Sequence, residues 1–214
     1  MRHVVSCLLA VLLPTLSAAA EPAQLPALVA PSEVVAGHTQ ADWSRIWWQW
    51  ARSFEDGDSP VADLTGELCG AKQSGSVWFL AGTYETHRTI RTCTVPAGKY
   101  LFFPLINYVV FPNCDCDEVP SCASVTASAK QVTEHVSSLV LELDGKVVTS
   151  LKRHRQATPQ CFDLAAQSGG GLSPAAGNGY YVMLRPLSRG THTLNFGGIL
   201  PGMSQAVTYT LHVE

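Results

Sequence analysis

The feature that most constrains the fold is a series of short apolar or alternating segments separated by turn residues. The last of them alternates strictly, with Val207, Tyr209, Leu211 and Val213 on one side of the chain, which is typical of a half-buried strand. Seven further segments have strand character: residues 77–82, 90–95, 100–106, 139–143, 147–148, 180–185 and 192–196. Together they predict an all-β fold, an antiparallel β-sandwich of jelly-roll or immunoglobulin-like type, with residues 39–214 as a single domain.

Three turn signals refine this outline. Asp144-Gly145, between two strand-like segments, predicts a β-hairpin. Pro104 lies inside an aromatic strand and predicts a bulge or an edge position there. Residues 167–179 are rich in glycine and small polar residues, and we expect them to form a flexible loop.

Four of the five tryptophans lie in one helical segment, "WSRIWWQW" at 43–50. At about 100° per residue, one face of this helix collects Trp43, Ile46, Trp47, Trp50 and Phe54. Such a stripe predicts packing on the core, with Thr39 or Asp42 as the N-terminal cap. Trp48 lies off the stripe and faces solvent, a second packing surface or a ligand. A second short helix is expected from Val125 to Ser138.

The first twenty residues have the pattern of a secretory signal peptide. An apolar run from Val4 to Leu13 follows a short basic start, and Ala18-Ala19-Ala20 supplies small residues for cleavage. The run is too short to span a bilayer, and no later segment is long enough. Residues 21–38 are expected to form an irregular arm. The sequence thus predicts an exported protein, periplasmic or extracellular, without a membrane span.

Without Cys7 of the signal peptide, six cysteines remain, and an even number in an exported chain predicts up to three disulfides. Sequence order favours a bond between Cys69 and Cys93. The other four would join the loop 113–122 to the later segment: Cys114, Cys116, Cys122 and Cys161. Cys114 and Cys116 are too close in sequence to pair comfortably with each other. A zinc site built on Cys-x-Cys-x5-Cys is the alternative.

The charge balance argues against nucleic acid as a partner. The sequence has 14 Lys and Arg against 17 Asp and Glu, and removal of Arg2 with the signal peptide changes the formal net charge from −3 to −4. There is no basic excess to bind nucleic acid or an anionic membrane surface. The sequence also has no Gly-x-Ser-x-Gly, His-Glu-x-x-His, Walker or dinucleotide-binding motif. This argues against the commonest hydrolase and nucleotide-binding architectures but does not exclude an enzyme with dispersed residues.

One polar cluster follows a buried strand and its glycine. It consists of Glu85, His87 and Arg88, which can grip an anionic or sugar ligand or supply an acid and a base. The alternative is a solvated hairpin turn between Gly82 and Ile90.

A second cluster, residues 152–155, is the one basic group in the sequence. It includes His154 and Arg155 and is either a site for a carboxylate or phosphate or a solvated strand end. His192, beside inward-facing apolar positions, is expected to be a hydrogen-bonded histidine at the rim of the core.

Asn113, Asp115 and Asp117 alternate like the opening of a calcium loop. Glu118 stands where the turn glycine belongs, and Ser124 stands where the closing acid belongs, which excludes an EF-hand. An irregular calcium site and an acidic disulfide loop both remain open. No cofactor is predicted, with calcium and zinc as the two metal alternatives.

Several strings resemble a family of exported, mostly bacterial β-sandwich proteins of unknown function. They are "WWQW" at 47–50, "VWFLAGT" at 77–83, "CTVPAGKYLFFPLIN" at 93–107, "LDGK" at 143–146 and "YYVMLRPLSRGTHTLNFGG" at 180–198. The resemblance covers most of the mature chain and implies export and a sandwich fold. It implies no catalytic residue.

Three functional hypotheses follow. The first is a binding module for a glycan or another envelope component, with candidate contacts Trp48, Glu85, His87, Arg88, Asn107, Asp115, His154 and Arg155. The second is a hydrolase or metal-dependent enzyme that gathers these acids and histidines in one cleft, and their convergence would favour it. The third is a structural envelope protein without a small ligand. Burial of Trp48, Tyr84 and Tyr108 would exclude the glycan hypothesis.

Overall fold

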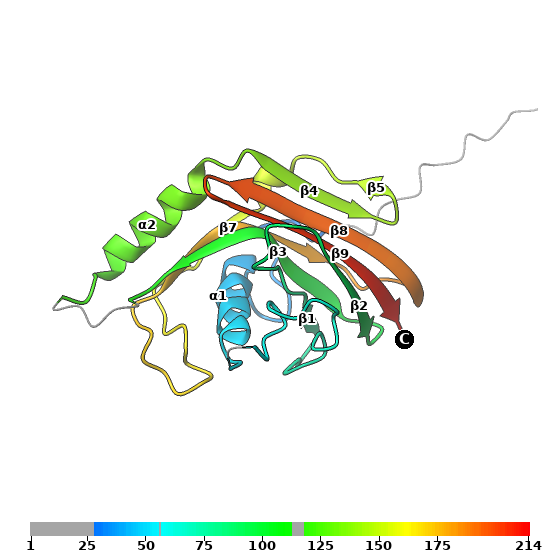
Figure 1. The fold of residues 1–214 in the computed structure, drawn as a ribbon, viewed down its shortest axis with the longest axis horizontal. Coiled ribbons are helices and arrows are strands. Elements are labelled where there is room, and N and C mark those ends of the chain that lie inside the picture. Colours follow the sequence, from blue (N-terminus) through cyan, green and yellow to red (C-terminus); the bar gives the residue numbers. More distant parts are fainter. Residues whose placement is uncertain (1–27, 56, 113–117) are drawn as a thin grey trace, which may run out of the picture.

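The computed structural model describes residues 28–55, 57–112 and 118–214, and most of this part of the chain lies in two β-sheets (Figure 1). A four-stranded sheet has the order β1 (Val77–Phe79), β3 (Tyr100–Val110), β7 (Ala176–Leu184) and β6 (Arg155–Ala157). A five-stranded sheet has the order β2 (Thr89–Val95), β9 (Met203–Val213), β8 (Gly190–Leu200), β4 (Ser138–Leu143) and β5 (Lys146–Val147). The mainly β prediction is confirmed.

The expectation of purely antiparallel sheets is wrong at two pairings. β1 runs parallel to β3, and β2 runs parallel to β9. The first case follows from the path of the chain, which leaves β1 for β2 in the other sheet and then returns to β3. Two reversals give β1 and β3 the same direction. In the second case the partners are far apart in sequence, so no short loop imposes an antiparallel arrangement.

The main core lies between the two sheets. The alternation in β9 is confirmed, because Val207, Tyr209, Leu211 and Val213 are all buried there. Phe103 of the four-stranded sheet packs on Phe196 of the five-stranded sheet, with ring centroids 4.6 Å apart. Burial of this apolar surface is the main force that holds the sheets together.

The bulge predicted at Pro104 is confirmed. The register of β3 against β7 shifts between Pro104 and Ile106, and β3 lies between β1 and β7 rather than at an edge. The buried Gln205 side chain donates to the carbonyl oxygens of Pro104 and Leu105, at 2.9 and 2.6 Å. A side chain of the opposite sheet thereby satisfies carbonyl groups at the bulge.

An arginine, Arg91, is buried in the same core. The alternation of β2 places it on the inward face, although a charged side chain is normally exposed. Arg91 faces inward with 1% of its surface exposed. Its guanidinium donates to four backbone carbonyls, those of Val61, Asp63, Ala81 and Gly82, and to the Tyr209 hydroxyl. The charge thus stabilises two loop segments against β2.

Helix α1 (Gln40–Ala51) covers the outer face of the four-stranded sheet (Figure 1). Thr39 caps it, with the Asp42 carboxylate completing a capping box. Trp43, Trp47 and Trp50 are buried as expected, and each indole N–H donates to a backbone carbonyl at 3.0–3.1 Å. The stripe is therefore core, with its polar atoms satisfied.

Helix α2 (Cys122–Glu134) lies at one end of the sheets (Figure 1). One disulfide joins Cys122 at its start to Cys161, and another joins Cys69 to Cys93, so both described bonds agree with the sequence-based expectation. Cys114 and Cys116 lie outside the described residues. Because Cys122 forms a disulfide, the zinc alternative loses one of its thiolates. Neither helix in the described segments is long and apolar enough to cross a membrane.

Three local features differ from the sequence-based outline. Residues 176–179, expected in a loop, begin β7, and two short elements were not anticipated: the 3₁₀ helix η1 (Leu151–His154) and β6. The expected hairpin is present, with Asp144 and Gly145 at φ 51° and 76°. The described part of the arm packs on the sheet, where the Val29 N–H donates to the Met183 carbonyl at 2.9 Å.

Candidate functional site

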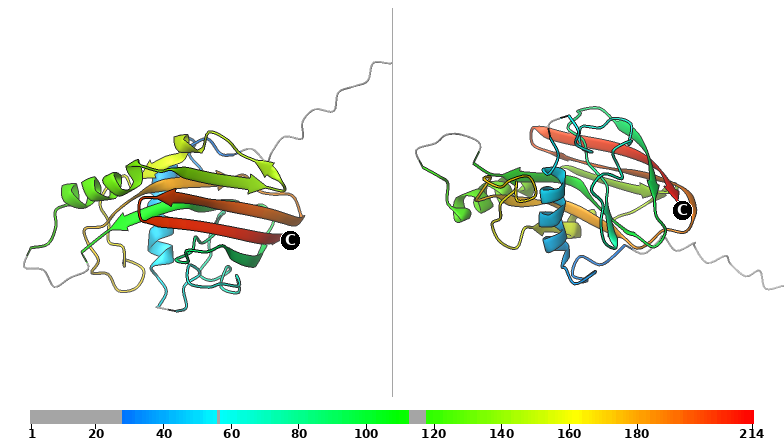
Figure 2. Two further views of the ribbon diagram at one scale, coloured as in Figure 1. Left: turned by 45° about the horizontal axis from the view of Figure 1, so that its top comes forward. Right: turned by 90° about the horizontal axis from the view of Figure 1, so that it is seen from below.

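The outer face of the five-stranded sheet carries no helix in the part of the chain that is described. Figure 2 shows β4, β8 and β9 at the front of the left view, with α1 behind them. Because side chains alternate along a strand, the strand register places the outward residues in rows across the sheet. The rows are Thr94, His212 and Thr191; Thr92, Thr210 and Thr193; Ile90, Thr208, Asn195 and Glu142; Ala206, Gly197 and Val140; and Ser204, Ile199 and Ser138.

The third row forms a continuous hydrogen-bonded chain across three strands. The Thr208 hydroxyl donates to Asn195 Oδ1 at 2.7 Å, and Asn195 Nδ2 donates to Glu142 Oε1 at 3.0 Å. At the other end, Arg88 Nη1 donates to Thr208 Oγ1 at 3.1 Å. Arg88 and the three polar residues of this row, which together we call the polar row, are thus held in order, with a cation at one end and a carboxylate at the other.

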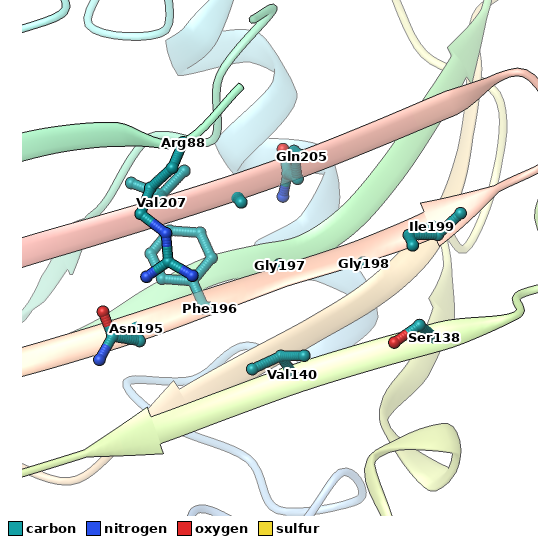
Figure 3. A pocket seen from close by; sticks show the side chains of 11 residues that line it. Arg88, Ser138, Val140, Asn195, Phe196, Gly197, Gly198, Ile199, Gln205 and Val207 are labelled. Atoms are coloured by element: carbon teal, nitrogen blue, oxygen red, sulfur yellow. The ribbon is translucent and has the colours of Figure 1, made fainter. Parts of the chain in front are cut away.

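Beside this polar row the sheet surface has a hollow of about 170 Å³. Its floor consists of Gly197 and Ala206, small residues that are partners across β8 and β9. Val140 and Ile199 form apolar walls (Figure 3). Figure 3 also shows the Arg88 side chain reaching over the sheet toward Asn195. The arrangement offers hydrogen-bonding groups on one side of a small apolar depression.

The backbone packing at Gly197 leaves no room for a side chain. A Cβ atom on this residue would lie 2.3 Å from the carbonyl oxygen of Gln205. The close approach of β8 and β9 at this point excludes a side chain, and this exclusion deepens the hollow.

A second hollow, of about 410 Å³, adjoins the first at Ile199. Tyr84, 63% exposed, and Met203 line it. The segment 83–88 therefore contributes to both hollows, with Tyr84 in one and Arg88 in the other. An exposed aromatic ring and a guanidinium lie along one continuous surface.

Of the first predicted cluster, only Arg88 enters this site. Glu85 and His87 contact each other instead, with Glu85 Oε2 3.5 Å from His87 Nδ1 and both side chains largely exposed. This pair forms a solvated turn before β2, which was the alternative interpretation for these residues.

Trp48 and Asn107 are buried rather than open to a ligand. Trp48 is 9% exposed, and its indole N–H donates to the Tyr181 hydroxyl at 2.9 Å. Asn107 Nδ2 donates to the same hydroxyl at 3.2 Å. Gly177 allows this packing, because a Cβ there would lie 2.9 Å from the Trp48 ring. Of the three alternatives for Trp48, the structure therefore favours a second packing surface over solvent or a ligand.

The basic cluster 152–155 divides between the interior and the surface. His154 has no exposed surface, and neither ring nitrogen has a hydrogen-bond partner among the described residues. Burial, aided by the nearby Arg153 charge, lowers the pKa of His154 from 6.5 to about 4. Arg155 donates to Asn178 Oδ1, to the Lys130 carbonyl and to the Thr133 hydroxyl at 2.9–3.0 Å. It ties α2 to β7.

His192 is the rim histidine that the sequence predicts. Its Nδ1 lies 2.8 Å from Asp144 Oδ2, and its Nε2 lies 2.9 Å from the Ser188 carbonyl. Burial lowers the pKa of His192, but the hydrogen bonds to Asp144 and Ser188 outweigh this effect, so the pKa is raised overall.

The candidates for an enzymatic cleft do not converge within the described segments. Asn107 lies on the α1 side of the four-stranded sheet, His154 and Arg155 lie near α2 and β7, and the Glu85–His87 pair lies on an exposed turn. Asp115 and the proposed calcium loop lie outside the described residues. In the described segments, no three His, Cys, Asp or Glu side chains are grouped to hold a metal ion.

Sequence reasoning missed the residues that complete the site. Thr208, Asn195 and Glu142 each occupy an outward position of a predicted strand, and this alternation was the available signal. The strand register, which aligns the three in one row, was not available. Gly197 and Ala206 could not be identified from the sequence, because small residues are common in strands. They form the floor of a hollow only because the register pairs them.

Comparison with known proteins adds little. No family model matches the chain, and no curated protein matches it. Among solved structures there is a likeness to one described as "Structure of PbICP-C in complex with falcipain-2", at 10% sequence identity and a TM-score of 0.29. The likeness covers 65% of this chain and 100% of that chain. Similarity at this level carries no argument about fold or function.

Proposed function

We propose that this protein is a binding module that holds a glycan or another envelope component on the outer face of its five-stranded sheet. The observation that carries the proposal is the hydrogen-bonded row of Arg88, Thr208, Asn195 and Glu142 beside the hollow over Gly197. Ligand sites commonly combine an apolar depression with a few fixed polar groups.

The chemistry of the row suits a ligand with many hydroxyl groups. The guanidinium donates, the carboxylate accepts, and the amide and hydroxyl groups do both. Because hydrogen bonds already hold these side chains in place, a ligand loses little affinity to ordering them. The apolar walls from Val140 and Ile199 provide packing for the C–H faces of a sugar ring, and the exposed Tyr84 ring extends this surface.

Binding is favoured over catalysis because the described acids and histidines do not share a cleft. A hydrolase needs an acid or base within hydrogen-bond reach of its substrate. Glu142, the carboxylate of the polar row, accepts from Asn195, and the described residues that line the adjoining hollow include no histidine. A structural envelope protein without a ligand is the remaining alternative.

The proposal includes the sandwich type and the location of the protein. The facing sheets support a β-sandwich, for which we retain the jelly-roll or immunoglobulin-like type as a prediction. The two disulfides support an oxidising compartment. Cleavage of a signal peptide and a periplasmic or extracellular location are the corresponding expectations.

The test is binding of the oxidised protein to an array of bacterial envelope glycans, followed by saturation-transfer NMR on any glycan retained. Ala206→Leu fills the hollow from a partly exposed position and should weaken binding at least tenfold. Thr210→Leu, on the same strand and the same face but outside the hollow, is the matched control and should bind as the wild type does. Absence of glycan binding by the wild type refutes the function, and equal binding by Ala206→Leu refutes the site.

A further inference from the structure

A larger hollow lies at the edge of the two sheets, beyond the Glu142 end of the polar row, and shares no lining residue with the hollow over Gly197. It has a volume of about 620 Å³ and lies between the β4–β5 hairpin and η1. This volume falls within the range of about 300–1,000 Å³ that is usual for small-molecule sites. No part of the proposed function uses it.

The lining of this hollow is mainly apolar. Leu139 and Val148 pack partly buried against the main core, and Leu151 is buried. Val147 is 65% exposed, although β-branched apolar residues normally gain stability from burial. The hollow thus extends the core outward and leaves an apolar surface in contact with water.

Two cations stand at one side of the hollow. Residues of a 3₁₀ helix repeat every three positions, so Leu151 and His154 of η1 face inward while Lys152 and Arg153 point outward. Both cations are exposed and line the hollow. Neither forms an ion pair with any described residue. A positive charge therefore borders an apolar surface, and no anion among the described residues forms an ion pair with it.

We propose that this hollow binds an aliphatic chain that ends in a single carboxylate. The chain would lie along Leu139, Val147 and Val148, and the carboxylate would accept hydrogen bonds from Lys152 and Arg153. A small inorganic anion would leave the apolar lining exposed, and an uncharged chain would leave the cations unused. An anionic bilayer is disfavoured because the protein is itself negatively charged and would be repelled. The formal charge is −3 for the full sequence, and it becomes −4 if Arg2 is removed with the signal peptide.

The first experiment measures calorimetric binding of dodecanoate, below its micellar concentration, to the oxidised protein. We expect saturable binding of one dodecanoate, with dodecanol and acetate each at least tenfold weaker. The double variant Lys152→Gln with Arg153→Gln should lose at least tenfold in affinity. The charge-matched control, Lys130→Gln with Arg189→Gln, removes two other exposed cations and should bind normally. Equal affinity for dodecanol, or an unaffected Lys152/Arg153 variant, overturns the proposal.

A second pair of variants tests the apolar part. Val147→Asp places a carboxylate in the hollow and should abolish dodecanoate binding, whereas Ile90→Asp alters an equally exposed apolar residue on another strand and should not. Both residues are exposed, so circular dichroism should show native folds. Ala206→Leu should leave dodecanoate binding unchanged, which separates this site from the glycan surface. Binding of anionic vesicles in place of free dodecanoate would assign the site to a membrane and overturn the proposal.

Discussion

Replacement of His154 by methionine should remove a large part of the acid sensitivity of this protein. His154 is fully buried, and its ring nitrogens have no hydrogen-bond partner in the described part of the chain. Its pKa in the folded protein is lowered from 6.5 to about 4. As the pH falls below 6.5, the unfolded chain takes up a proton at this position and the folded protein does not. The stability associated with His154 is therefore lost as the pH falls from 6.5 toward 4.

The magnitude follows from the gap between the two pKa values of His154. At about 1.4 kcal/mol per pH unit, the gap corresponds to about 3 kcal/mol of unfolding free energy that the wild type loses and His154→Met keeps. Methionine also removes two unsatisfied polar atoms from the interior. Near neutral pH the variant should therefore be at least as stable as the wild type, by up to about 1 kcal/mol.

The assay is urea unfolding followed by tryptophan fluorescence at a series of pH values from 7.5 to 4. Other groups titrate in both proteins, so the quantity of interest is the difference in unfolding free energy between the variant and the wild type. His154→Gln is a second variant, polar but without a titrating group, and should lose the same pH dependence. If the difference between His154→Met and the wild type stays constant over this range, His154 is not held neutral by burial and the reasoning fails.

Three further predictions concern the stability of the fold and the titration of His192. Gly197→Ala should lower the unfolding free energy by about 2 kcal/mol in a thermal or urea melt, because the added Cβ meets a backbone oxygen of β9; Thr193→Ala, an exposed change on the same strand, should have little effect. Asp144→Asn should lower the pKa of His192 in an NMR titration, because the carboxylate that favours the protonated ring is gone, and an unchanged pKa would contradict this origin. Arg91→Met should destabilise the protein by about 3 kcal/mol or more, because it leaves several buried carbonyl groups without a donor; a variant as stable as the wild type would show that water replaces the guanidinium.

Features set by neighbours along the chain could be predicted from the sequence. The inward positions of β9 follow from alternation, and the buried face of α1 follows from helical periodicity. The cap at Thr39 depends on its contact with Asp42, three residues away, and the turn at Asp144 depends on the positive φ angles of Asp144 and Gly145. In each case the deciding contact is local, so sequence alone is sufficient.

The remaining features depend on partners that are distant in sequence. Trp48 is fixed by Tyr181, 133 positions away, and no local pattern identifies that partner. The basic cluster at 152–155 looks uniformly solvated in sequence, yet the 3₁₀ geometry of η1 turns His154 inward and Arg153 outward. The polar row likewise exists only because the register of three strands aligns Asn195 with its neighbours.

The position of β9 has a consequence for biogenesis. β9 is synthesised after every other described strand, yet it lies between β2 and β8 and pairs with both along most of its length. The five-stranded sheet therefore cannot close during translation of the preceding strands, and β2 remains without its neighbour until then. Such long-range pairing slows folding. The five-stranded sheet is therefore expected to form only after the whole of β9 has been synthesised.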